Sequence, residues 1–191
     1  MNYIGIDEVG RGPIAGAVAV GSVCILGEYC RKVKKMFPVI KDSKKLSHKQ
    51  RLEWLKRIDE AKEKGFLTYA ISFVSSSVID KLGIVFAINK AISGTLKSLR
   101  PRENTKFLLD GGLYLPKCYC NQQTIIKGDE KKIAIALASI VAKVARDLRM
   151  IKLAKKFPNY GFEKHKGYGT KAHYEALKKY GVTPHHRKTF L

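Results

Sequence analysis

Five short, mostly apolar runs constrain the fold of this chain more than any other feature. They cover Tyr3–Ile6, Ala17–Leu26, Phe66–Val74, Phe107–Leu109 and Gln123–Ile126. Runs of this length, rich in β-branched and aromatic residues and bounded by turn residues, indicate β-strands. Because helical patterns separate them in a chain of 191 residues, we expect one α/β domain with a buried core.

Four helical patterns lie between and after these runs. Their expected ranges are 47–65, 77–99, 133–151 and 170–181. Ser47 and Gln50 form a capping box for the first, and Ser77 and Thr170 are expected to cap the second and the last. The third is the longest, with an apolar residue every three or four positions on one face. A loop punctuated by glycine and proline is expected over 158–169.

The composition points to an anionic partner. Lys and Arg number 37 against 16 Asp and Glu, which gives a net charge of +21. Such a surface favours nucleic acid over an anionic membrane, because no basic amphipathic helix stands out; the alternative is a basic surface with no specific partner. No apolar run is long enough to span a bilayer and no signal segment is evident, so we expect a cytoplasmic protein. The four cysteines, Cys24, Cys30, Cys118 and Cys120, do not have zinc-site spacing and are expected to be reduced.

Four acids lie where the strand-like runs end. Asp7 and Glu8 follow the first run, Asp110 follows the fourth, and Asp129 comes shortly after the fifth. Carboxylates that converge at the rim of a sheet repel one another, and a divalent ion that prefers oxygen ligands, Mg²⁺ or Mn²⁺, relieves that repulsion. Two such ions on a basic protein point to phosphodiester hydrolysis. The alternative is four unrelated acids that cap turns or pair with lysines.

A glycine-rich loop follows the first acids. The segment from Gly10 through Arg11 and Gly12 to Ala15 fits the dinucleotide-binding pattern, but that pattern opens a helix and a strand is expected here. We expect instead that the glycines let backbone N–H groups approach a phosphate or a sugar hydroxyl, with Arg11 adding a phosphate contact. The alternative is a tight hairpin in which glycine serves only the turn.

The remaining candidate residues are expected either to stabilise the fold or to contact the substrate. Asp147 is expected to pair with Lys143 rather than bind metal. One of Lys44 and Lys45 is expected to contact phosphate. The histidines at 165, 173, 185 and 186 look too scattered for a metal site and better suited to phosphate contact or acid catalysis, and Trp54 to packing.

Seven motifs run through the chain in a fixed order. They are GIDEVGRGPIAG (5–16), DSKKLS (42–47), LLDGG (108–112), KGD (127–129), ASIVAKVARD (138–147), HKGYGTKAHYEAL (165–177) and PHHRKTF (184–190). This set closely resembles the type 2 ribonucleases H, the bacterial ribonuclease HII family. The type 3 enzymes differ in having threonine where Arg11 stands.

The resemblance implies a ribonuclease H-like α/β fold, with a mixed five-stranded sheet flanked by helices and a small helical C-terminal part at about 157–191 that contributes to substrate binding within a single catalytic domain, 1–191. It implies an endoribonuclease that cuts the RNA strand of RNA–DNA hybrids and cuts 5′ of single ribonucleotides embedded in duplex DNA, as in ribonucleotide excision repair. Two metal ions, Mg²⁺ or Mn²⁺, would support hydrolysis that leaves 3′-hydroxyl and 5′-phosphate ends.

The same resemblance assigns the residues. Metal binding and catalysis map to Asp7, Glu8, Asp110 and Asp129, and substrate binding maps to Gly10, Arg11, Gly12, Lys44 and Tyr168. Tyr168 would sense the junction between RNA and DNA. We expect a monomer, without an evident sliding-clamp peptide after the last motif. Two alternatives stay open: a related metal nuclease that acts on DNA, and a basic nucleic-acid-binding protein without activity.

Overall fold

The fold is taken from a computed structural model that describes residues 1–38 and 46–191. In chain order its elements are β1 (Asn2–Val9), β2 (Val18–Ile25), η1 (Gly27–Tyr29), α1 (Cys30–Met36), α2 (His48–Glu63), β3 (Leu67–Val74), α3 (Ser76–Leu99), β4 (Thr105–Asp110), β5 (Gln122–Ile125), α4 (Gly128–Lys131), α5 (Ile133–Lys156), η2 (Pro158–Tyr160), α6 (Phe162–His165), α7 (Lys171–Tyr180) and η3 (Lys188–Phe190).

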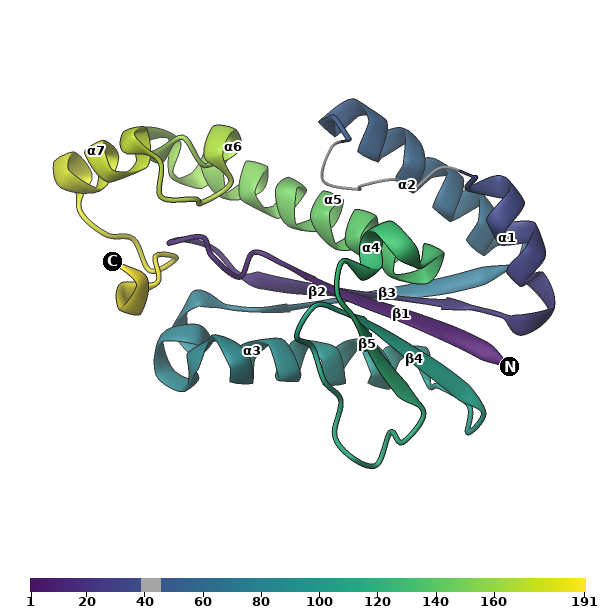
Figure 1. Cartoon of the computed structure of the whole chain (residues 1–191). Helices are drawn as coiled ribbons and strands as arrows, with labels where there is room; N and C mark the ends of the chain where they lie inside the picture. The colour runs from purple at the N-terminus through teal and green to yellow at the C-terminus, as the bar shows by residue number, and fades with distance from the viewer. Residues whose placement is uncertain (39–45) are drawn as a thin grey trace.

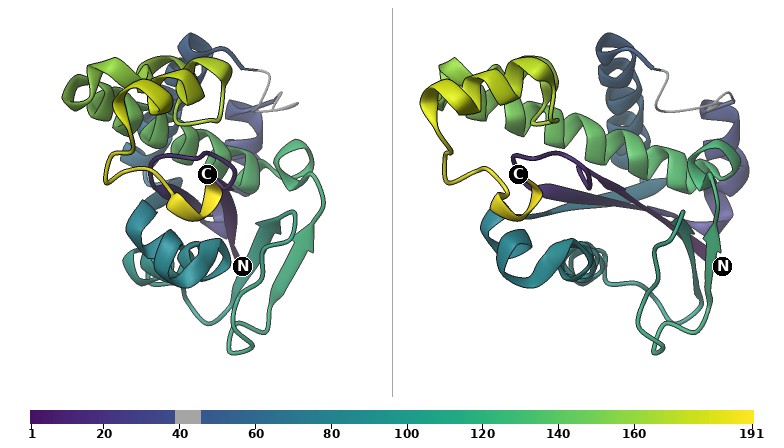
Figure 2. Two further views of the ribbon diagram at one scale, coloured as in Figure 1. Left: turned by 90° about the vertical axis from the view of Figure 1, so that its left-hand side faces the viewer. Right: turned by 60° about the vertical axis from the view of Figure 1, so that its left-hand side comes forward.

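The five strands form one mixed sheet in the order β3-β2-β1-β4-β5. β1, β2 and β3 pair antiparallel, whereas β4 and β5 run parallel to β1. Helix α3 covers one face of the sheet, and α5 crosses the other face with α1 and α2 beside it (Figures 1 and 2). The expected fold, a mixed five-stranded sheet flanked by helices, is confirmed.

Alternation along β1 divides its side chains between two cores. Ile4 and Ile6 pack into the core under α3, which also takes side chains from β2 and β4. Gly5 faces α5, and a second core lies on that side between α1, α2, α5 and the sheet. Since β-strand side chains alternate, Asp7 also faces α5 at the end of the strand.

Helix α5 lies unusually close to the sheet, because two glycines lie beneath it. A Cβ atom added at Gly5 would come within 2.1 Å of the Ala134 carbonyl carbon, and one at Gly21 within 2.4 Å of the Ala138 carbonyl oxygen. Larger residues at either position would push the helix outward. The glycines therefore set the height of α5 above β1 and β2.

The C-terminal part packs on the far end of α5. Tyr160 and Phe162 stack with ring centroids 5.4 Å apart and join Met150 and Ala154 of α5 in a third apolar cluster. Ala15, from the loop after β1, belongs to the same cluster. The C-terminal residues thus contact the N-terminal loop directly.

Several element boundaries differ from the expectation. β1 continues to Val9, so Asp7 and Glu8 lie within its last residues rather than after it. The cap of α3 is Ser75, whose backbone is extended, and Ser77 is already helical, so the expected cap was wrong. Part of the predicted 158–169 loop is helical, as η2 and α6, and α1 was not expected. The capping box at Ser47 and Gln50 is confirmed.

Two further observations concern membrane-spanning helices and cysteines. Over the residues that the structure describes, no helix is long and apolar enough to cross a membrane. All four cysteines are free thiols: Cys24 is buried, Cys30 is half-buried, and Cys118 and Cys120 are exposed.

The close seating of α5 gives a prediction about stability. Gly5→Ala places a methyl group into the backbone of α5, so we expect a loss of about 2 kcal/mol or more in the free energy of unfolding. Gly112→Ala is the matched control, because a Cβ atom there meets nothing within 4 Å. Urea denaturation of the two variants measures the difference. Equal stability of both variants would contradict the close seating.

Candidate active site

A cavity of about 440 Å³ opens where β1 and β4 end, beneath the middle of α5. It is lined by Asp7, Glu8, Val9, Gly10, Arg11, Gly12, Arg51, Asp110, Ser139, Ile140, Lys143 and Tyr168. Three of the four predicted acids, the predicted glycine loop and the predicted tyrosine therefore share one cavity. These residues come from β1, β4, α2, α5 and the C-terminal part, so only the folded chain brings them together.

Asp7 is the buried acid at the centre of this group. Its side chain is 4% exposed, and its Oδ1 accepts a hydrogen bond from the Glu8 amide at 2.8 Å. Burial is the main cause that raises the pKa of Asp7 well above its ordinary value, and repulsion from Glu8, Asp110 and Asp129 raises it further. A hydrogen bond from Ser139 on α5 opposes these effects. The four predicted acids are thus close enough to sense one another's charge.

Asp110 and Asp129 are linked through the start of α4. Asp110 Oδ1 accepts a 2.6 Å hydrogen bond from the Gly128 amide, which holds α4 against the end of β4. Asp129, the next residue, is 1% exposed and does not line the cavity. Lys127 precedes them with a left-handed backbone, φ 54°. The turn between β5 and α4 therefore places the fourth acid behind the other three.

The carboxylate oxygens of these four acids are chemically suited to a hard divalent cation. Carboxylate oxygens are the ligands that Mg²⁺ and Mn²⁺ prefer, and a cation would remove the repulsion that raises the pKa of Asp7. Among the described residues, no three His, Cys, Asp or Glu side chains are yet close enough to hold one ion together. Ion binding would therefore have to draw the carboxylates inward.

The glycine loop passes beside these acids. Gly10 has φ 89°, and a Cβ atom there would lie 2.1 Å from Arg146 Nε, so this position requires glycine. Gly12 has open space around it. Within the described residues, the N–H groups of Arg11 and Gly12 donate to no backbone carbonyl. The loop can therefore offer backbone donors to a ligand in the cavity. The Arg11 side chain is exposed and lies 3.8 Å from Glu8.

Two buried arginines hold this loop from behind. Arg187, which is fully buried, donates to the carbonyls of Gly10, Arg11 and Gly16 at 2.6, 2.8 and 3.0 Å. Arg146 on α5 donates in the same way to Ala15, Ala17 and Lys166. Burial is the main cause that lowers the pKa of Arg187 to about 10, with repulsion from Arg146 adding to it. The carbonyls of the loop thus point inward.

Tyr168 lines the same cavity as Asp7, Glu8 and Asp110. It follows a tight turn in which Lys166 and Gly167 both have left-handed backbones, φ 52° and 86°. The Ala15 amide donates to the Gly167 carbonyl at 3.1 Å, which ties this turn to the glycine loop. The Tyr168 side chain is 45% exposed. Its ring is therefore available to a ligand, and its position relative to the loop is set by the backbone.

Three of the four histidines lie together rather than scattered, and the predicted phosphate contact was wrong for the buried His173 and His186. His173 and His186 are buried, with Nε2 atoms 3.0 Å apart, and the His165 ring stacks on His173 at 4.2 Å. His186 Nδ1 accepts from the Thr183 amide, while His173 Nδ1 bonds the Tyr168 carbonyl. Burial, followed by repulsion from His173, lowers the pKa of His186 to about 4. Neutral and buried, this pair supports the Tyr168 turn and is inaccessible to phosphate.

The remaining predictions have mixed outcomes. Asp147 is buried and pairs with Lys143 at 2.8 Å, as expected. Trp54 packs beside Phe37, also as expected. Lys44 and Lys45 lie outside the described residues, so their predicted phosphate contact stays a prediction.

Sequence reasoning missed four residues of the site and its support. They are Arg51 and Ser139, which line the cavity, and Arg146 and Arg187, which hold the loop. The two buried arginines are hidden among 37 basic residues. Their only signal is that each lies inside one of the ordered motifs.

Comparison with known proteins places these features in one family. The family model described as Ribonuclease HII matches residues 4–191. Curated proteins named Ribonuclease HII from Endomicrobium trichonymphae and Clostridioides difficile are 45% and 44% identical, covering 97% and 99% of this chain and 83% and 70% of theirs. A solved chain from the PCNA:RNase HII complex of Archaeoglobus fulgidus superposes with a TM-score of 0.78 at 25% identity, covering 98% of this chain and 94% of that one.

The raised pKa of Asp7 gives a prediction about pH. Burial disfavours the ionised carboxylate of Asp7 in the folded state, which lowers the free energy of unfolding. This destabilisation is absent below the unfolded-state pKa of about 3.9, grows as the pH rises above it, and is complete above the folded-state pKa. Without divalent metal, Asp7→Asn should therefore raise Tm at pH 7 by a few degrees, and less at pH 4. Added Mg²⁺ should raise Tm of the parent more than that of the variant.

The control is Glu103→Gln, which removes an exposed charge from the turn before β4. It should leave Tm nearly unchanged at both pH values. A lower Tm for Asp7→Asn at pH 7 would show that the carboxylate is stabilised by the fold instead.

Proposed function

The chain belongs to the ribonuclease HII family and is a metal-dependent type 2 ribonuclease H endonuclease, and on that premise we propose its substrate, its site and its reaction. It cuts the RNA strand of RNA–DNA hybrids and cuts 5′ of single ribonucleotides in duplex DNA. Asp7, Glu8, Asp110 and Asp129 hold two divalent ions. The products carry 3′-hydroxyl and 5′-phosphate ends.

One observation carries this proposal: a cluster of mutually repelling carboxylates lies in the same cavity as a loop whose Arg11 and Gly12 N–H groups donate to no backbone carbonyl among the described residues. Burial and three neighbouring acids raise the pKa of Asp7, and Arg11 and Gly12 border the same space. A nuclease that recognises ribose must place a metal site and a hydroxyl-recognising group within one nucleotide of each other. The shared lining of this cavity, with carboxylates and loop together, supports the proposal.

Hydrolysis requires a bond from a water oxygen to phosphorus and release of the 3′ oxygen of the preceding nucleotide. When bound, the two ions supply charge neutralisation and a more acidic water. Asp7 and Asp110 would face them from the cavity wall, and Asp129 from behind through α4. Lys143 on α5 also lines the cavity, and its ion pair with Asp147 holds it there. In that position it would contact phosphate from the side.

Recognition falls to the loop and to Tyr168. Because Arg187 and Arg146 hold its carbonyls, the loop can present N–H groups to the ribose 2′-hydroxyl with little rearrangement. Tyr168 would pack its ring on the sugar after the ribonucleotide. Residues 157–191 would thus contribute to substrate binding within one catalytic domain.

Three finer points also belong to the proposal. Either Mg²⁺ or Mn²⁺ fits oxygen ligands of this kind. The net charge of +21 suits a duplex partner, and Lys44 is proposed as a further phosphate contact. We propose that the enzyme acts as a monomer in the cytoplasm.

A cleavage assay tests the substrate. One duplex contains a single ribonucleotide and its match is entirely DNA; with Mg²⁺ or Mn²⁺ the first should be cut 5′ of the ribonucleotide and the second left intact. Asp110→Asn should lower the rate on the first by about a hundredfold or more, because it removes a charged ligand. Cleavage of the all-DNA duplex at a similar rate would indicate the alternative, a related nuclease that acts on DNA.

Asp147→Asn is the contrasting variant for the acid assignment. Asp147 is buried but pairs with Lys143, so its loss should act through stability. Calorimetric titration of metal into each folded variant separates the two effects. If Asp147→Asn abolished metal binding while Asp129→Asn did not, the fourth acid would be misassigned.

Tyr168 gives a second functional prediction. Because the side chain is 45% exposed, Tyr168→Ala should change Tm little while lowering the initial rate at a single embedded ribonucleotide strongly. Tyr168→Phe keeps the ring and should fall between the parent and Tyr168→Ala. Tyr114→Ala is the control, because Tyr114 is also exposed, at 68%, and lies outside both the cavity and the C-terminal part. A wild-type rate for Tyr168→Ala would remove the junction-sensing role.

A further inference from the structure

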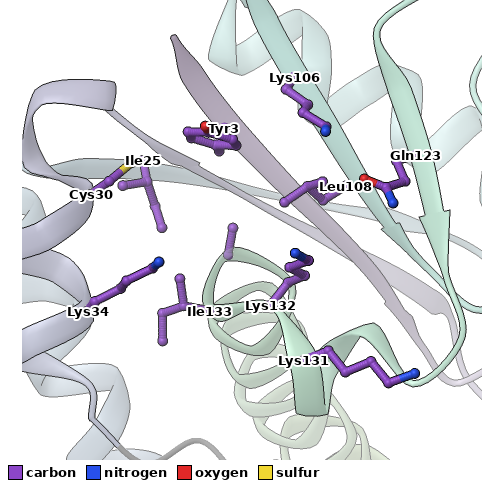
Figure 3. Close-up of a pocket in the computed structure, with 11 residues that line it drawn as sticks. Tyr3, Ile25, Cys30, Lys34, Lys106, Leu108, Gln123, Lys131, Lys132 and Ile133 are labelled. Atoms are coloured by element: carbon purple, nitrogen blue, oxygen red, sulfur yellow. The ribbon is translucent and has the colours of Figure 1, made fainter.

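A second cavity, of about 410 Å³, lies at the start of α5 and away from the candidate active site. Its walls come from β1, β4, α1 and the α4–α5 junction (Figure 3). Apolar side chains, among them Leu108 and Ile133, form much of its lining, and the Tyr3 ring borders it. Tyr3 precedes Asp7 by four residues on β1, which places the two cavities about 13 Å apart along the strand.

Lysines surround this apolar floor. Lys34 comes from α1, Lys106 from β4, and Lys131 and Lys132 from the α4–α5 junction. Among the described residues that line the cavity there is no acid. Lys34 and Lys132 extend toward the open space in Figure 3, whereas Lys131 points away and donates to the Ile126 carbonyl at 2.9 Å. Within the described part of the chain, Lys34, Lys106 and Lys132 have no carboxylate within ion-pair distance.

Two of these lysines lie at the amino end of α5, where basic residues are unfavourable. Lys132 is the N-cap of α5 and makes no side-chain capping bond, and Lys131 precedes it. The amino end of a helix carries partial positive charge, so it favours acids or Ser, Thr, Asp and Asn there, and lysine is unfavourable. The same two lysines lie at the carboxyl end of the four-residue helix α4, where cations are favourable, so the unfavourable placement concerns the 24-residue helix α5. Departures of this kind are expected where a ligand supplies the missing charge.

We propose that this cavity binds a nucleoside 5′-phosphate, free or at the end of a nucleic-acid strand. The phosphate lies between Lys34, Lys132 and the first turn of α5, where ammonium groups and the helix end favour an anion. The flat base lies on the apolar floor beside Tyr3, and the Gln123 amide at the rim offers a donor and an acceptor.

The dimensions favour a single nucleotide over a duplex. Cavities of about 300–1,000 Å³ take small ligands, and a duplex is too wide to enter one of this size. The cavity has no described lining residue in common with the candidate active site. Its occupancy is therefore separate from the proposed cleavage, and its test does not depend on that function.

Calorimetric titration of AMP into the whole protein tests the site, with EDTA present so that the carboxylates hold no ion. Inorganic phosphate and adenosine are the partial probes. Saturable AMP binding should weaken about tenfold or more in Lys34→Gln/Lys132→Gln, since two charge-assisted contacts are lost. Lys90→Gln/Lys97→Gln is the matched control, because it removes the same charge from exposed positions of α3 on the opposite face; it should change affinity less than twofold.

The location is read from amide shifts in NMR spectra during the same titration. We expect shifts at Ile133 and Ala134, and AMP should bind more tightly than phosphate or adenosine alone. If only an oligonucleotide bearing a 5′-phosphate bound, with the same loss in Lys34→Gln/Lys132→Gln, the ligand would be a strand end. No saturable binding of either, equal losses in both double variants, or shifts confined to Gly10–Gly12 would overturn the proposal.

Discussion

The close contact between α5 and the sheet is the constraint on which the rest of this molecule depends. Gly5 and Gly21 leave no side chain between the strands and the helix backbone, so α5 lies directly against β1 and β2. That height brings Ser139 within hydrogen-bonding reach of Asp7. It also places Arg146 behind the glycine loop and the first turn of α5 beside the lysine-lined cavity. A small outward shift of one helix would disturb all three.

Two groups of like charge lie near the candidate active site, one acidic and one basic. On the cavity side, acids repel one another and raise the pKa of Asp7. Behind the loop, two buried guanidinium groups are bonded to backbone carbonyls, without an ion pair to a carboxylate among the described residues. Buried charges of this kind are costly unless hydrogen-bonded. Both are understandable if selection acted on a metal site and on a rigid loop rather than on stability.

The C-terminal part completes the site through backbone contacts. Arg187 lies four residues from the end of the chain yet bonds the carbonyls of Gly10 and Arg11. The neutral pair His173 and His186 supports the turn that carries Tyr168. The loop after β1 and the turn that carries Tyr168, which come from the two ends of the chain, are thus held together by these contacts.

Features that arise from neighbours along the chain could be predicted from the sequence. Strand-like runs located Asp7, Glu8 and Asp110 at a sheet rim, because alternation and strand ends are local properties. The capping box at Ser47 and the Lys143–Asp147 pair follow from spacing on a helix. The contacts between residues far apart in the chain became visible in the folded molecule alone. Arg187 contacts a residue 177 positions away, the histidines gather around Tyr168, and lysines from separate elements surround one cavity. Such contacts depend on how elements pack, and no periodicity in the chain encodes them.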